Sequence, residues 1–162
     1  MIEWYKKVVF GNYANFNGRA RRSEYWYFVL MNMIISTVTM LIDNVLEVKF
    51  GVNLLYNIAV FIPTLSVSVR RLHDIGKSGW VLLISYIVVI ICGLGLVFGV
   101  VMAQQRNSFD NWFTIPIVII MLAICIWMLV LFCTDSDEGT NQYGPNPEYG
   151  SDEIDEIGAT EA

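Results

Sequence analysis

The residues of this chain that are best suited to chemistry lie in one short polar segment between two apolar runs. His73 and Asp74 are neighbours there, and an imidazole beside a carboxylate can act in acid–base catalysis. The alternative is structural: Asp74 pairs with an arginine, and His73 caps a carbonyl or lies at a membrane interface. His73 is the only histidine of the chain, which excludes a metal site built from several histidines. We favour the structural interpretation and expect no cofactor and no metal.

Basic residues near this pair, and in an earlier polar segment, offer a second kind of chemistry. A guanidinium can hold a phosphate through two parallel hydrogen bonds, and each basic residue near an anionic membrane surface adds about 1 kcal/mol of attraction. With His73 and Asp74 they form a candidate site for an anionic headgroup or a protein partner. The alternative is that they only hold the inner loops in the cytoplasm. The six residues, which we name the Arg-rich collar, are Arg19, Arg21, Arg22, Arg70, Arg71 and Lys77.

Gly76, Lys77 and Ser78 match the end of a phosphate-binding loop, but the rest of that loop is missing. The loop requires a glycine five residues before its second glycine, and position 71 is an arginine. The preceding element is a long apolar run rather than a strand. We therefore reject nucleotide hydrolysis. Whether the chain is an enzyme of another kind stays open, and we favour a non-catalytic role.

Four long apolar runs carry these polar segments. They cover residues 25–47, 53–69, 80–103 and 112–133, and a helix needs about 20 apolar residues to cross a bilayer. Apolar residues make up 56% of the chain, and the runs are apolar all round, which is not typical of a soluble fold. We predict an all-α, polytopic membrane protein: a bundle of four transmembrane helices over residues 25–133. Residues 1–24 form a cytoplasmic, interfacial segment, and residues 134–162 form an acidic tail whose last dozen residues are disordered.

Basic residues also predict the orientation of the chain. Five Lys and Arg residues lie before the first run and three lie in the central segment 70–79, whereas the other two connections carry one each. Short segments rich in Lys and Arg stay on the cytoplasmic side. We therefore expect both termini and the central segment in the cytoplasm.

Several residues inside the runs predict how the helices pack. Gly95, Gly99 and Ala103 recur at a spacing of four, so they form a stripe on which another helix can approach closely. The stripe serves either the packing of the bundle or a homodimer face. Pro63 predicts a kink in the second run. Cys92 and Cys125 fall at similar depths, so they could touch, and whether they pair stays open.

Three polar motifs, taken in this order, resemble a known family. They are Gly-Arg-x-Arg-Arg-Ser-Glu-Tyr-Trp from Gly18 to Trp26, Arg-Arg-Leu-His-Asp-Ile-Gly-Lys-Ser-Gly-Trp from Arg70 to Trp80, and a segment rich in Gly, Asn and Pro from Gly139 to Pro147. The chain is similar to domain of unknown function 805, the YhaH-like bacterial inner-membrane proteins. The resemblance runs from about Phe10 to Pro147 and implies a small polytopic inner-membrane protein, but it supplies no reaction.

Three functions fit these observations. The first is a non-catalytic membrane protein whose Arg-rich collar binds anionic lipid or a protein partner, and we favour it. The second is an oligomeric transporter or channel subunit that assembles through the small-residue stripe. The third is a membrane enzyme that holds a lipid phosphate with the arginines and uses His73 and Asp74 for proton transfer. The acidic tail could screen the collar. We expect membrane lipids as partners and no nucleic acid.

Overall fold

The computed structural model describes residues 1–48, 51–106 and 114–147, and most of these are helical. Four helices are long and apolar enough to cross a membrane: α2 (Arg22–Val45), α3 (Val52–Asp74), α4 (Trp80–Arg106) and α5 (Thr114–Cys133). A short helix α1 (Ile2–Lys6) and one π-helix η1 (Lys7–Gly11) precede them. The fold is that of an all-α, multi-pass membrane protein, as predicted.

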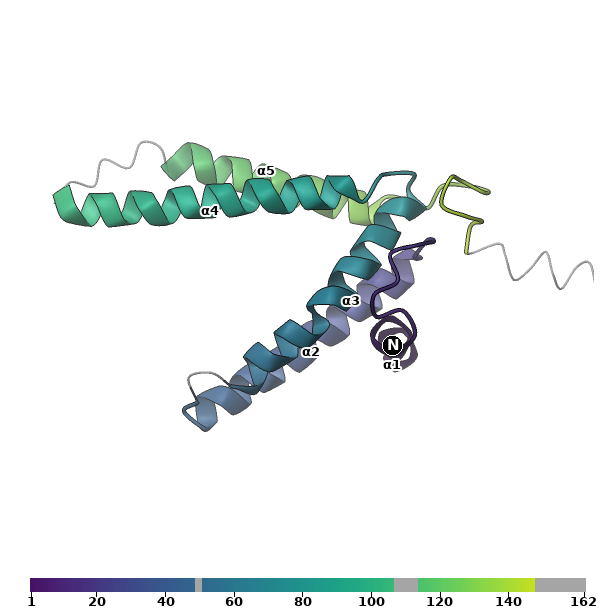
Figure 1. Ribbon diagram of the computed structural model, residues 1–162, viewed down its shortest axis with the longest axis horizontal. Helices are drawn as coiled ribbons and strands as arrows, with labels where there is room; N and C mark the ends of the chain where they lie inside the picture. The colour runs from purple at the N-terminus through teal and green to yellow at the C-terminus, as the bar shows by residue number, and fades with distance from the viewer. Residues whose placement is uncertain (49–50, 107–113, 148–162) are drawn as a thin grey trace, which may run out of the picture. The chain divides into compact units, whose positions relative to one another are not determined.

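The chain forms two compact units, and the first comprises residues 1–78 and the segment after α5. In it, α2 and α3 lie side by side and run in opposite directions (Figure 1). Figure 1 looks along α1 while α2 and α3 run across the page, so α1 crosses this hairpin. The stacked rings of Tyr5 and Phe28, 5.7 Å apart, hold α1 against α2.

The turn between α2 and α3 is closed by an acidic cap. The carboxylate of Asp43 accepts hydrogen bonds from the backbone N–H groups of Val52 (2.8 Å) and Asn53 (2.9 Å). These are two of the donors that the start of α3 leaves without an intrahelical partner. Gly51 makes room for the cap, because a Cβ at position 51 would overlap the Asp43 carboxylate. Asp43 thus serves the end of the hairpin.

Polar side chains inside the hairpin bond the two helices to each other. The amide of Asn53 donates to the carbonyl of Ser36 (2.8 Å) and to the hydroxyl of Thr39 (2.9 Å). The hydroxyl of Tyr56 donates to the side-chain oxygen of Asn32 (2.6 Å). Hydrogen bonds between helices are the usual role of amides inside a membrane.

Pro63 lies inside α3 and is fully buried. A proline has no N–H, so the carbonyl four residues earlier, that of Ala59, loses its helical partner. The hydroxyl of Tyr13 donates to this carbonyl over 2.7 Å and replaces the lost bond. Ser66 further joins the two segments, since its hydroxyl lies within hydrogen-bond distance of the carbonyls of Pro63 and Asn12. The segment before α2 therefore satisfies the backbone that the proline disrupts.

The helix α3 extends beyond the run expected from the sequence. The run was predicted to end at residue 69, yet α3 continues to Asp74, so Arg70 and Arg71 lie in its last turns rather than in a loop. The helix ends where Gly76 adopts a left-handed conformation (φ 67°). The N–H of Lys77 then bonds the carbonyl of Leu72, which completes a Schellman motif.

The second unit covers Gly79–Thr134 and consists of the hairpin of α4 and α5. Ser85 donates to the sulfur of Met128 across this hairpin (3.4 Å). Gly99 is buried, and a Cβ at Gly95 would lie 3.5 Å from the side chain of Ile117. The structure therefore describes the surroundings of Gly95 and Gly99, two members of the predicted small-residue stripe. The side chain of Ala103, the third member, lies outside what the structure describes.

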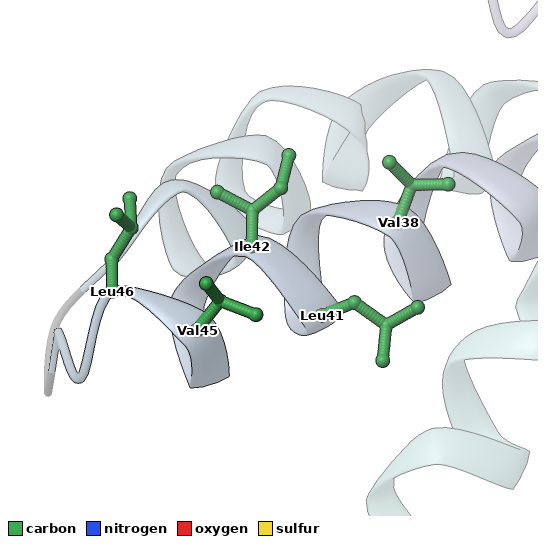
Figure 2. Close-up of a pocket in the computed structure, with 5 residues that line it drawn as sticks. All are labelled: Val38, Leu41, Ile42, Val45 and Leu46. Atoms are coloured by element: carbon green, nitrogen blue, oxygen red, sulfur yellow. The ribbon is translucent and has the colours of Figure 1, made fainter.

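Most apolar side chains of the long helices are exposed, as expected of surfaces that face lipid. Figure 2 shows an apolar pocket along the C-terminal half of α2 and the turn after it. All its lining side chains are aliphatic: Val38, Leu41, Ile42, Val45 and Leu46. Acyl chains suit such a surface. The three cysteines, all within the described residues, form no disulfide.

Candidate functional site

The three polar motifs meet at the end of α3, and one guanidinium connects them. Arg19 donates through Nε to a carboxylate oxygen of Asp74 (2.9 Å) and through Nη2 to the carbonyl of Asp137 (2.7 Å). Its Nη1 donates to the carbonyls of Gly139 (2.7 Å) and Gly144 (3.4 Å). Arg19 is only 8% exposed. Its donors are therefore directed at the protein's own backbone.

Asp74 is the second centre of this network and is fully buried. Its carboxylate pairs with Arg19 and Arg71 and also accepts the hydroxyl of Ser136. A carboxylate at the C-terminal end of a helix opposes the helix dipole, so its burial there requires compensating cations. The two arginines supply them.

A second ionic cluster lies between the start of α2 and the end of α3. Glu24 is 2% exposed and accepts from Nη1 of Arg70 (2.7 Å) and from the ammonium of Lys7 (2.8 Å). The backbone continues this link, because the N–H of Ala20 donates to the carbonyl of Arg70 (3.1 Å). The residues before and after the start of α2 are thus fastened to α3.

His73 has partners of its own. Its Nδ1 lies 3.3 Å from the carbonyl of Gly18, and its ring stacks on Tyr143 with centroids 3.7 Å apart. The amide of Asn141 donates to the His73 carbonyl (2.9 Å). His73 and Asp74 are thus adjacent in sequence, but each side chain contacts a different set of groups.

The segment 135–147, which we name the C-terminal segment, is ordered around these contacts. The N–H of Asp137 bonds the carbonyl of Asp74 (3.0 Å), and the amide of Asn146 bonds the carbonyl of Asp137 (3.1 Å). Asn141 and Gly144 pair in a tight turn. The first part of the predicted acidic tail is therefore a structural element. The last dozen residues, which we predicted to be disordered, lie outside the described residues.

The six residues of the Arg-rich collar divide into two sets. Arg19, Arg70 and Arg71 are buried and directed at groups of this chain. Arg22 and Lys77 are exposed and Arg21 is half-buried. Arg22 pairs with the exposed carboxylate of Asp135. The second set therefore lies at or near the protein surface, whereas the first set lies inside.

Sequence reasoning did not single out the residues that complete the network. Glu24 and Lys7 complete the second cluster, and Ser136 and Tyr143 contact Asp74 and His73. Glu24 carried a usable signal, since an acidic residue in the first turn of an apolar helix requires a partner. Among the described residues, no three His, Cys, Asp or Glu side chains are placed to hold a metal ion.

The helical hairpins and the polar network at the end of α3 define a class, the multi-pass helical membrane proteins. The family described as "Protein of unknown function (DUF805)" matches residues 13–145, a range that contains the first two polar motifs and most of the third. The chain belongs to this family.

It is 33% identical over 152 residues to inner membrane protein YhaI of Escherichia coli K12, covering 93% of this chain and 99% of YhaI. It is 32% identical to inner membrane protein YhaH of the same strain, covering 91% and 98%. No solved structure matches it. The chain is a protein of the bacterial inner membrane.

Proposed function

We propose that this protein is non-catalytic and binds anionic phospholipid headgroups through its exposed basic residues, with both termini and the turn after α3 in the cytoplasm. The orientation follows from the excess of Lys and Arg before α2 and between α3 and α4. The residues that bind are the exposed Arg22 and Lys77 and the half-buried Arg21 of the collar, assisted by the exposed Lys6.

The observation that carries the proposal is the combination of charge and apolar surface on the N-terminal segment. Ile2 and Phe10 are 61% and 80% exposed, and Lys6 lies between them and is also exposed. Exposed apolar side chains beside lysines are typical of helices that lie in the headgroup region of a membrane. This segment crosses the hairpin of α2 and α3 (Figure 1), so it can lie along the membrane surface while the hairpin spans it.

The contacts of the polar network support a non-catalytic role. The Asp74 carboxylate accepts from two arginines and a serine, so it is not available as a general base. His73 is held by stacking and a backbone contact rather than by a carboxylate. These groups stabilise the end of the hairpin.

The test is retention of phosphatidylglycerol relative to phosphatidylcholine by the purified protein in mixed nanodiscs. We expect the triple variant Arg21→Gln, Arg22→Gln, Lys77→Gln to lose several-fold of its enrichment of phosphatidylglycerol, and the loss to shrink at high salt. The matched control, Arg21→Lys, Arg22→Lys, Lys77→Arg, keeps every charge and should behave as wild type. Equal enrichment in wild type and the Gln variant would contradict the proposal.

A further inference from the structure

One edge of the Arg70 guanidinium has no hydrogen-bond acceptor among the described residues. Arg70 is 3% exposed, and its Nη1 donates to Glu24. Its Nε and Nη2 are buried and have no hydrogen-bond partner within the part of the chain that the structure describes. These two N–H groups point the same way from one edge of the planar group, and this edge binds carboxylates and phosphates through two parallel bonds.

Buried donors of this kind are almost always paired in native proteins. A charged donor without a partner is more costly than a neutral one, because burial removes the water that would otherwise solvate the charge. The edge of Arg70 therefore calls for an acceptor that is not among the described residues.

The buried charges of the network at the end of α3 do not balance. Three guanidiniums are buried here among the described residues, against two carboxylates. The set is Arg19, Arg70 and Arg71 with Glu24 and Asp74. One positive charge is left over, and buried charges persist where they are paired. An acceptor with one negative charge would satisfy both the edge and the balance.

The position of Arg70 indicates which anions reach it. The apolar run of α3 ends at residue 69, and Arg70 follows it directly, just before the last turn of the helix. A charged side chain at the end of an apolar run lies at the boundary between the hydrocarbon core and the headgroups. Lys7 bonds the same Glu24 carboxylate, and its side chain is half exposed. Because Lys7 and Arg70 bond the two oxygens of one carboxylate, Lys7 lies close enough to add its charge to the same site.

We propose that the open edge of Arg70 binds one phosphate group, carried by a phospholipid headgroup or present as free inorganic phosphate. A phosphodiester carries the single negative charge that the cluster lacks, and its tetrahedral oxygens can accept from Nε and Nη2 of Arg70 and from Lys7 together. The inference deepens the proposed function, on which it rests for the headgroup level of this end. It differs in naming a single buried site rather than an exposed surface.

Native mass spectrometry in mild detergent tests the site. With added phosphatidylglycerol, we expect wild type to retain one phospholipid per chain at collision energies that strip the others. Arg70→Lys keeps a cation for Glu24 but lacks the planar edge, so its retention should fall at least tenfold. The control Arg106→Lys makes the same exchange in α4, outside the Arg-rich collar and in the second unit, and should retain the lipid.

A second arm replaces the lipid by inorganic phosphate in lipid-free detergent. Binding there without lipid retention would identify free phosphate as the source, and lipid retention alone would identify the headgroup. If wild type binds neither, or if Arg70→Lys binds as wild type does, the proposal is overturned and a water molecule is the partner. If lipid or phosphate binds only to a chain truncated after Tyr149, the proposal is also overturned. The partner of Arg70 is then a carboxylate of the tail.

Two further comparisons keep the result interpretable. Should Arg70→Lys fail to accumulate, Lys7→Gln at its half-exposed position replaces it, and unchanged retention in that variant would overturn the proposal. The triple Gln variant of Arg21, Arg22 and Lys77 is measured in parallel. Loss of the exchangeable lipids in the triple variant, with the retained lipid unaffected, separates the exposed surface from the Arg70 site.

Discussion

At the scale of single residues, the conspicuous polar side chains of this protein serve mainly one another. Arg19 and Asp74 were singled out from sequence as candidates for binding, and the structure places both inside, where they join three segments far apart in the chain. The sequence indicated which residue types matter, but it could not indicate their partners. The fold brings Ser136 to Asp74 and the carbonyls of the C-terminal segment to Arg19.

The buried pairing of Asp74 leads to a prediction on stability. Asp74→Asn leaves Arg19 and Arg71 without their counter-ion, and breaking a buried pair in this way costs about 3–5 kcal/mol. Asp135→Asn removes a carboxylate that is 84% exposed and should change the free energy of unfolding by less than about 1 kcal/mol. Equilibrium unfolding in mixed micelles measures both, and equal effects would contradict the structural role of Asp74.

Tyr13 and Pro63 give a second prediction at this scale. Tyr13→Phe removes the hydrogen-bond donor of the Ala59 carbonyl at an exposed position, so it should cost about 0.5–1.5 kcal/mol. In a Pro63→Ala background, residue 63 regains an N–H that can bond this carbonyl, and the cost of Tyr13→Phe should fall below about 0.5 kcal/mol. A double-mutant cycle measures the coupling. The same loss in both backgrounds would show that Tyr13 acts in some other way.

At the scale of elements, the ends of α3 are determined by particular residues and not by its apolar run. Its start is capped by Asp43 from α2, and its end is closed by the turn at Gly76. The sequence predicted a second span ending at residue 69, since arginines end an apolar run. In the structure α3 continues because the side chains of Arg70 and Arg71 find carboxylates there.

The cap on α3 predicts non-additive effects of two substitutions. Gly51→Ala places a methyl group where the Asp43 carboxylate lies, and Asp43→Ala removes that carboxylate. Each should destabilise the protein by about 0.5–2 kcal/mol through loss of the cap. Because both remove the same interaction, the double variant should lose no more than the worse single one. Gly11→Ala, where the added Cβ meets no atom within 4 Å, is the matched control. Simple addition of the two losses in thermal unfolding would contradict this account.

At the scale of the whole molecule, the chain after its last long helix returns to the first unit and completes it. Arg19 bonds carbonyls more than a hundred positions later in the sequence, at Asp137, Gly139 and Gly144. Contacts of this range order the C-terminal segment, although its composition resembles that of a flexible tail.

Two truncations test this closure. A chain ending at residue 134 loses the C-terminal segment and with it several hydrogen bonds to the Arg19 guanidinium, each worth about 1.5–3 kcal/mol. A chain ending at residue 147 keeps all of these bonds and should melt as the full chain does. Thermal unfolding in one detergent compares the two, and an identical melting temperature for both would contradict the role of the segment.

The sequence by itself determined that this protein is a helical, multi-pass membrane protein and where its spans lie, because apolar length is a local property set by the thickness of the bilayer. It also identified the three polar motifs and the family that they characterise. Only the tertiary structure decided which of the collar arginines are buried, that α3 reaches Asp74, and that residues 135–147 are ordered. These depend on pairs of charges and donors that are distant in sequence, and a buried charge is stabilised only where the fold brings its partner.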